Sequence, residues 1–217
     1  MMVRGSSRAS GHFLQALLFL LVAAVDLGAQ DRMPPIPVDK MTKAQREAVA
    51  KSFPPGTTGP ISGPYASFLR SPEVLVGRKI VGDYLLGYKG VLPPNLTEMA
   101  ILMTARQWTQ QFIWNAHSQL ATKAGVKPHI IQAIGEGRRP AEMTDDEATI
   151  YDFCDELYRN RSISDATYAR ALTKLGEQGI VEAVATIGHW ASNAMMMNTV
   201  RLPLPAGATA PLAPFPR

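Results

Sequence analysis

The sequence feature that most constrains the fold is a series of helix start and stop signals along most of the chain. Ser71-Pro72-Glu73 is a helix start, because serine caps well, proline suits the first helical position and glutamate favours the positive helix end. Thr144 and Glu147 form a capping box, and Gly90 and Gly125 are helix stops. The signals predict helices at about 41–52, 71–88, 96–108, 109–124, 128–134, 145–159, 165–175 and 177–199.

The alternation of apolar and polar residues that is typical of β-strands is not found outside the loops, and no internal repeat is evident. We therefore expect an all-α protein of about seven to eight helices. The 217 residues are 46% hydrophobic and 18% charged, which suits one globular domain and excludes a disordered chain. The net charge of +4 is small and scattered, so it does not indicate nucleic-acid binding.

Residues 1–29 have the order of a secretory signal peptide. Arg4 and Arg8 precede an unbroken apolar run at 16–25, and small residues at Gly28 and Ala29 follow it. We place the cleavage after Ala29, with Ala24 as the alternative. The other interpretation is a membrane anchor, but the run is about half the ~20 residues that a spanning helix needs. We therefore expect a secreted or periplasmic protein that is free of the membrane after cleavage.

The remaining chain divides into three parts by composition. Residues 30–70 form a Pro-rich arm with one short helix, residues 71–205 form the helical domain, and residues 206–217 form a flexible Pro/Ala-rich tail. Cys154 is the only cysteine, so it cannot form an internal disulfide. It lies between apolar neighbours on a helix, which favours a buried, inert thiol over a nucleophile or an intermolecular bridge.

The helix predicted over 109–124 carries the first candidate for chemistry. At 100° per residue, His117 lies on the flank of the apolar stripe, beside Gln110 and Trp114. We expect this histidine to be half covered, so that it is partly desolvated and still reaches a ligand. The alternative is a structural histidine that bonds a carbonyl group.

Two further polar features lie on helices. Glu98 has apolar neighbours, and carboxylates are rarely buried without a partner, so we expect it to have one. The alternative is that it lies in the first helical turn only to interact favourably with the helix dipole. If the helices that carry Glu98 and His117 are antiparallel neighbours, the two side chains lie within direct or one-water hydrogen-bond reach.

The last helix is apolar nearly all round except for a narrow polar stripe, which we interpret as a wet pocket wall or a solvated face. The stripe consists of Glu182, Thr186, His189 and Asn193.

The chain resembles the carboxymuconolactone decarboxylase family, which shares its fold with alkylhydroperoxidase D. The resemblance covers about three fifths of the chain, from about residue 71 to residue 205. It rests on the segments PPNLTEMAILMTAR and WNAHSQLATKAGV, on the acidic helix 144–158, and on GIVEAVATIGHWASNAMMMN before a Pro-rich exit. It implies an alkylhydroperoxidase D-like helical domain that assembles as a homotrimer or homohexamer.

The peroxidase branch of this fold carries Glu-x11-Cys-x2-Cys-x3-His. Counted from Glu98, these positions hold Gln110, Ile113 and His117, so the glutamate and histidine match and both cysteines are missing. Peroxide reduction needs an attacking and a resolving thiol, and therefore we do not expect a thiol peroxidase. Trp114, three residues before the histidine, fits the decarboxylase branch.

In that branch the resemblance implies cofactor-free loss of CO2 from a small carboxylated lactone or a similar acid. We expect His117 to be the proton donor or shuttle and Glu98 to orient it or relay to it. We expect Trp114, Arg106, His189 and Gln110 to bind substrate, with Trp114 as a pocket wall and Arg106 or His189 on a carboxylate. Export from the cytoplasm leaves the substrate itself open.

Two other interpretations remain at the level of sequence. One is a non-catalytic helical oligomer or small-molecule binder that has inherited the fold. The other is a metal site made of His117, His189 and Glu98, which the sequence disfavours because these residues lack a metal-ligand spacing such as His-x3-His. Because the last helix is apolar over most of its circumference, self-association is expected on physical grounds as well.

Overall fold

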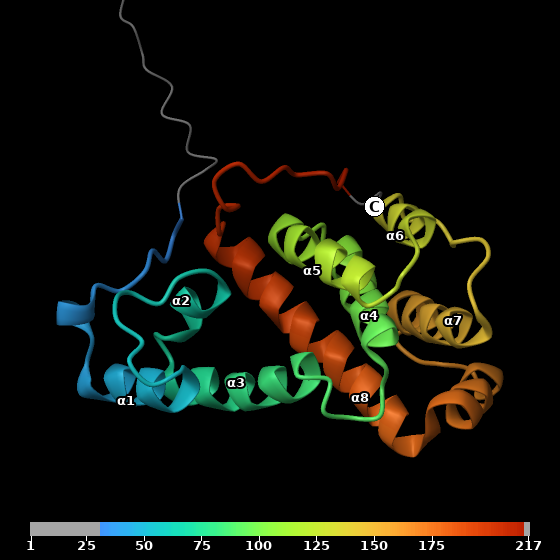
Figure 1. Cartoon of the computed structure of the whole chain (residues 1–217), viewed down its shortest axis with the longest axis horizontal. Coiled ribbons are helices and arrows are strands. Elements are labelled where there is room, and N and C mark those ends of the chain that lie inside the picture. The colour runs from blue at the N-terminus through green and yellow to red at the C-terminus, as the bar shows by residue number, and fades with distance from the viewer. Residues whose placement is uncertain (1–30, 215–217) are drawn as a thin grey trace, which may run out of the picture.

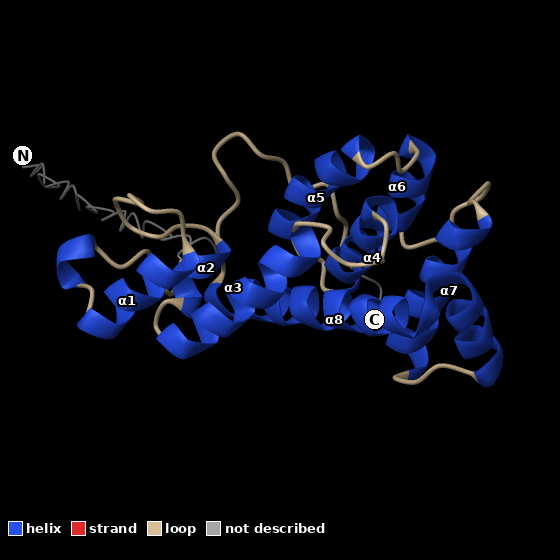
Figure 2. Ribbon diagram, turned by 60° about the horizontal axis from the view of Figure 1, so that its bottom comes forward, coloured by secondary structure: helices blue, strands red, loops and turns tan. Residues whose placement is uncertain are grey.

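A computed structural model describes residues 31–214, and these residues form an all-α protein (Figure 1). The predicted signal peptide falls on residues outside this range. Eight α-helices and no strand are present between residues 31 and 214, as the sequence predicted (Figure 2). The helices are α1 Lys43–Ser52, α2 Pro64–Phe68, α3 Pro72–Leu86, α4 Pro94–Gln107, α5 Gln111–Lys123, α6 Pro128–Gly135, α7 Asp145–Asn160 and α8 Asp165–Val200, and a 3-10 turn spans Val38–Lys40. None of the helices described is long and apolar enough to cross a membrane.

Helix α4 is the centre of the main core. It packs against α5, α6, α7 and α8, and every residue from 96 to 106 is buried. Figure 1 shows α8 running diagonally across the molecule beside α4, with α6 and α7 on the far side. Because α4 is enclosed all round, a polar side chain on it must find its partner inside the protein.

A smaller core joins α1, α2 and α3 at the other end of the molecule (Figure 1). Phe68 and Leu69, at the end of α2, are buried there together with Leu75 from α3. The guanidinium of Arg78 lies 4.4 Å from the centre of the Phe68 ring. The sequence predicted α1 and α3 but not the five-residue α2, whose residues are too few to show a helical period.

Helix boundaries follow the predicted signals closely, with one local difference. Thr144 and Glu147 form the predicted capping box at the start of α7. Gly176 has φ 69° and ψ 175° and interrupts α8 where the sequence predicted one helix to end and the next to begin. α3 begins at Pro72 as predicted, but the Ser71 side chain makes no capping hydrogen bond with the described residues.

Candidate functional site

Glu98 and His117 are hydrogen-bonded to each other between α4 and α5. The two helices are joined by a turn of three residues, and His117 Nδ1 lies 2.8 Å from Glu98 Oε2. The Glu98 side chain has no exposed surface, and His117 is 7% exposed. The predicted hydrogen-bond reach between the two residues is therefore confirmed.

Trp190 of α8 determines which nitrogen of His117 carries the proton. Its indole N–H donates to His117 Nε2 over 3.1 Å, and the two rings meet edge to face with centroids 5.5 Å apart. An indole N–H is a donor only, so Nε2 must be the acceptor and the neutral imidazole carries its proton on Nδ1. The Nδ1–H then donates to the Glu98 carboxylate.

Tyr88 completes the set of hydrogen bonds around Glu98. Its hydroxyl donates to Glu98 Oε1 over 2.7 Å from the segment just after α3. Burial, and then the hydrogen bond to Glu98, raise the pKa of the Tyr88 phenol far above its usual value. Tyr88 is half-buried and has φ 48°, in the left-handed region that is uncommon for a residue with a side chain. We call Tyr88, Glu98, His117 and Trp190 the Glu98 network.

The position of His117 on α5 differs from the prediction. The buried residues of the helix are Ile113, Trp114, His117 and Ala121, so the histidine lies at the centre of the buried stripe. Ala116, the residue before it, is exposed. Compared with the prediction, α5 is turned about its axis so that His117 faces the core, where it is hydrogen-bonded to Glu98 and Trp190. The pattern of apolar residues does not reveal such hydrogen bonds.

Sequence reasoning missed Tyr88 and Trp190. Tyr88 was expected only as a helix end, and Trp190 only as part of an apolar face. Trp190 lies 73 residues from His117, and no local pattern links them. The one available signal was general: a buried tryptophan or tyrosine usually finds a partner for its polar atom.

Trp114 and Arg106 meet at a separate cavity of about 760 Å³ between α5 and α6, called here the α5–α6 cavity. Gly135 of α6 leaves room for the indole, because a Cβ there would lie 2.9 Å from Trp114. Residues 211–213 of the C-terminal segment form another wall. Neither Glu98 nor His117 is among the described residues that line it. The predicted site residues therefore do not form one site: Glu98 pairs with His117, Trp114 and Arg106 line this cavity, and the other two lie elsewhere.

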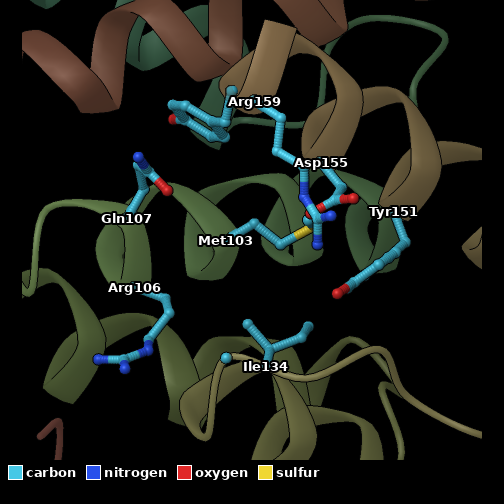
Figure 3. Close-up of a pocket in the computed structure, with 9 residues that line it drawn as sticks. Met103, Arg106, Gln107, Ile134, Tyr151, Asp155 and Arg159 are labelled. Atoms are coloured by element: carbon cyan, nitrogen blue, oxygen red, sulfur yellow. The ribbon is translucent and has the colours of Figure 1, made fainter. Parts of the chain in front are cut away.

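Arg106 also borders a second cavity, of about 290 Å³, that is drawn in Figure 3. Met103 is one of its lining residues and is drawn in the middle of the view, and Arg106 extends away from Asp155 and Arg159 (Figure 3). Asp155, which is half-buried, and Arg159, which is exposed, form an ion pair at 3.0 Å. Arg106 is the charged residue that this cavity shares with the α5–α6 cavity, where Glu136 is the other charged residue of the described lining.

Gln110 has a structural position at the start of α5. Its side-chain oxygen accepts from the Phe112 N–H over 2.7 Å, and its amide nitrogen donates to Asn198 Oδ1 over 2.8 Å. Both ends of the amide are thus engaged within the protein. Substrate binding by Gln110 remains a prediction that would require one of these bonds to open.

His189 lies apart from the Glu98 network, between α8 and α3. A Cβ on Gly82 of α3 would lie 3.1 Å from His189 Nε2, so a larger residue there would force the ring to shift by a few tenths of an ångström. Burial, and then the charge of Arg78, lower the pKa of His189 to about 4. Arg78 also donates to the His189 carbonyl over 3.0 Å. His189 is thus neutral at pH 7 and packed against α3.

The rest of the polar stripe on α8 is buried too, so the solvated face is wrong, and of the stripe only Glu182 is among the described residues that line the groove between α3 and α8. The residues are 0–9% exposed: Glu182, Thr186, His189 and Asn193. Asn193 accepts from Arg78 over 2.5 Å, and Glu182 accepts from Tyr84 over 2.7 Å. α3 thus supplies donors to two residues of the stripe, Glu182 and Asn193. Within residues 31–214 no cluster of potential metal ligands is found.

Cys154 is fully buried on α7, as the sequence predicted. Burial raises the pKa of its thiol far above its usual value, so the reactive thiolate is strongly disfavoured. The side chain packs in the main core.

The fold has a counterpart among solved structures, although the sequence does not identify a family. No known protein-family pattern and no curated protein sequence match the chain. The structure is similar to that of the debrominase Bmp8, solved as a cysteine-to-alanine variant in complex with 2,3,4-tribromopyrrole. The TM-score is 0.59 at 12% sequence identity, over 82% of this chain and 92% of that chain. At this identity the similarity establishes a shared helical fold.

Proposed function

We propose that this protein is an enzyme that transfers protons without a cofactor, and that it decarboxylates a small carboxylated lactone or a similar organic acid. The observation that carries the proposal is the buried Glu98–His117 hydrogen bond of 2.8 Å. Burying a carboxylate beside a titratable ring is expensive for stability, and such pairs are concentrated at functional sites. The similarity to a debrominase that binds a small ring compound supports a small-molecule enzyme on this fold.

The chemistry would proceed from His117 Nε2. In the reaction, the bond between the substrate carbon and its carboxylate breaks, CO2 leaves, and the electron pair stays on carbon. The imidazolium then gives its Nε2 proton to that carbon, and Glu98 stabilises the charged ring from the Nδ1 side. Trp190 donates to the same Nε2 atom in this structure. Its indole must therefore move away when Nε2 is protonated, because two N–H donors cannot face each other.

The α5–α6 cavity would hold the acid, with Arg106 on its carboxylate and Trp114 against its ring. Ser118 lines this cavity and directly follows His117 on α5. Trp114 lies one turn before His117 on the same helix. A rotation of the Trp114 indole would thus be a short route by which the cavity could open toward the imidazole.

The test is CO2 release by the purified mature protein from a panel of small carboxylated lactones and related acids. His117→Gln is expected to lower turnover by about 10²–10⁴-fold, the usual contribution of a general acid–base residue. The matched control is His129→Gln, which removes an exposed histidine of α6. Equal losses in the two variants, or full activity in His117→Gln, would reject the assignment.

A second candidate is a non-catalytic binding protein. Both ring nitrogens of His117 are already hydrogen-bonded to the protein, which favours this candidate. His117 is also not one of the described residues that line the α5–α6 cavity. In this case the acids would bind with measurable affinity and would be recovered unchanged.

We further propose that the protein self-associates as a homotrimer or homohexamer through α3 and α8. Ile80 is 68% exposed, Val181 is 67% exposed, and Val184 is 47% exposed on these helices. Ile80 and Val181 also line one apolar groove between the two helices. Light scattering at micromolar concentration tests this, and a monomer would contradict it.

Export through a cleaved signal peptide is a separate proposal. It is supported by the basic start and the short apolar run described above. Mass spectrometry of the protein from its native host should find a mature N-terminus near Gln30. An intact N-terminus in the cytosol would contradict it.

A further inference from the structure

The C-terminal segment is tied to the α5–α6 cavity by specific contacts. Gln111, the first residue of α5, bonds both backbone groups of Leu212: its Nε2 donates to the Leu212 carbonyl over 2.6 Å, and its Oε1 accepts from the Leu212 N–H over 3.0 Å. Arg106 donates to the Ala213 carbonyl over 2.5 Å. The Leu212 side chain is 5% exposed and belongs to the main core. Composition predicted a loose tail, whereas residues 211–213 are anchored.

These three residues, called here the strap, form one wall of the cavity, and the helices form the others. The strap is not part of a helix, and Pro211 and Ala213 on either side of Leu212 are exposed. The opposite walls are supplied by buried side chains such as Trp114 on α5. The strap is therefore the wall that can be removed without unfolding a helix.

The atom that the strap presents to Arg106 is a neutral carbonyl oxygen. A carboxylate binds a guanidinium more strongly, because the hydrogen bonds are charge-assisted and two can form side by side. The cavity volume of about 760 Å³ accommodates a small ring compound beside the Trp114 indole. An acid of this kind would compete directly with the Ala213 carbonyl.

We propose that the strap closes the α5–α6 cavity and that a small aromatic or alicyclic carboxylate enters it by displacing the strap from Arg106. The strap then acts as a latch, because its closed state reduces the apparent affinity for the acid. The ligand class rests on the proposed function, and the latch rests on the Gln111, Leu212 and Arg106 contacts alone.

The experiment is calorimetric titration of the full mature chain with 1-naphthoate, with neutral 1-naphthamide as the comparison ligand. Gln111→Ala removes both bonds to Leu212 but leaves Arg106 and the described cavity lining intact. Loss of two neutral hydrogen bonds in the closed state should tighten 1-naphthoate binding about five- to tenfold. The matched control is Asn115→Ala, which removes an amide from α5 at a residue that does not line the cavity, and its Kd should equal that of the wild type.

Hydrogen exchange of the Leu212 amide gives a second measurement that needs no ligand. Exchange should be faster in Gln111→Ala than in Asn115→Ala, and 1-naphthoate should accelerate it in the wild type. Unchanged Kd in Gln111→Ala, no binding of 1-naphthoate to either protein, or equal binding of 1-naphthamide would overturn the proposal. Tight binding without CO2 release would leave the latch standing and would reject only the decarboxylase.

Discussion

Glu98 and Glu182 are two buried carboxylates that differ in the donors around them. Each accepts a hydrogen bond of 2.7 Å from a tyrosine near the end of α3, Tyr88 for Glu98 and Tyr84 for Glu182. Glu182 also accepts from Gln178 over 2.8 Å and from two consecutive backbone N–H groups over 2.9 Å each. The other partner of Glu98 is the imidazole of His117.

The donors of Glu182 make it a structural residue. Burial raises the pKa of Glu182, but hydrogen bonds from the Leu92 N–H, Gln178, Tyr84 and the Val91 N–H together hold it below its usual value. The carboxylate thereby fixes the segment between α3 and α4. None of its partners exchanges a proton near neutral pH, whereas the imidazole facing Glu98 is the side chain suited to that task. A buried glutamate is thus informative about function only once its donors are known.

The largest expected effect is on stability, and it concerns Glu182. Glu182→Ala leaves two backbone N–H groups and two side chains without their acceptor, and we expect a loss of about 3 kcal/mol in the free energy of unfolding. Glu98→Ala leaves only the Tyr88 phenol and the His117 imidazole without an acceptor, so the loss in the free energy of unfolding should be smaller. Urea unfolding of both variants measures the difference. A larger loss in Glu98→Ala would break the distinction between the two glutamates.

The second effect is on turnover and has the opposite order. Glu98→Gln should slow CO2 release by about 100-fold, because an amide stabilises the imidazolium less than a carboxylate does. Glu182→Gln should keep turnover within about twofold, since the residue lies outside the proton path. Binding of the substrate acid should be retained in both variants. Similar kinetics in the two variants would remove the functional role of Glu98.

The third effect is on stability at acidic pH and arises where His189 of α8 packs against α3. The pKa of His189 is about 4 in the folded protein, below its unfolded value, because of burial and the Arg78 charge. The unfolded chain therefore binds more protons between about pH 6.5 and 4, and stability falls as the pH drops through this window and then levels off. We expect a loss of roughly 1–3 kcal/mol, measured by urea unfolding at several pH values.

The control for the acid effect is a matched pair of histidine variants. His189→Gln should flatten the pH dependence between about pH 6.5 and 4, because the titrating ring is gone. His129→Gln removes an exposed ring and should keep the slope of the wild type. An unchanged slope in His189→Gln would show that His189 does not control stability at acidic pH.

The smallest effect concerns the two tyrosines. Tyr88→Phe removes one hydrogen bond to Glu98 and should reduce the free energy of unfolding by about 1 kcal/mol. Tyr84→Phe should have less effect, because Glu182 keeps three other donors. Nitrogen NMR of His117 should still find the proton on Nδ1 in Tyr88→Phe, since Trp190 fixes it. A proton on Nε2 in the wild type would contradict the proposed tautomer.

Much of the fold could be predicted because helix ends carry local chemical signals. The Thr144 capping box and Gly176 mark boundaries by hydrogen bonds and backbone freedom within a few residues. The hydrogen bond between Glu98 and His117 was also expected, because the family resemblance pairs the two residues and a short turn between antiparallel helices places them at similar heights. α2 could not be predicted, because five residues depend on tertiary contacts more than on their own period.

The environment of the site required contacts from far along the chain. Trp190 fixes the His117 proton, and Tyr84 and Arg78 turn the polar stripe of α8 into a buried seam. Periodicity reports which face of a helix is polar but not whether another helix presents donors to that face. For the same reason, the anchored Leu212 could not be distinguished from a loose Pro/Ala-rich tail.

The strap also has a consequence for the order of assembly during synthesis. Glu98 and His117 are 19 residues apart and can meet as soon as α4 and α5 have left the ribosome as a hairpin. Gln111 and Leu212 are 101 residues apart, and Arg106 and Ala213 are 107 apart. The nascent chain can thus form the Glu98–His117 hydrogen bond early, but it can form the strap contacts only after residue 213 has emerged. During that interval, the Trp114 wall of the cavity lacks its cover.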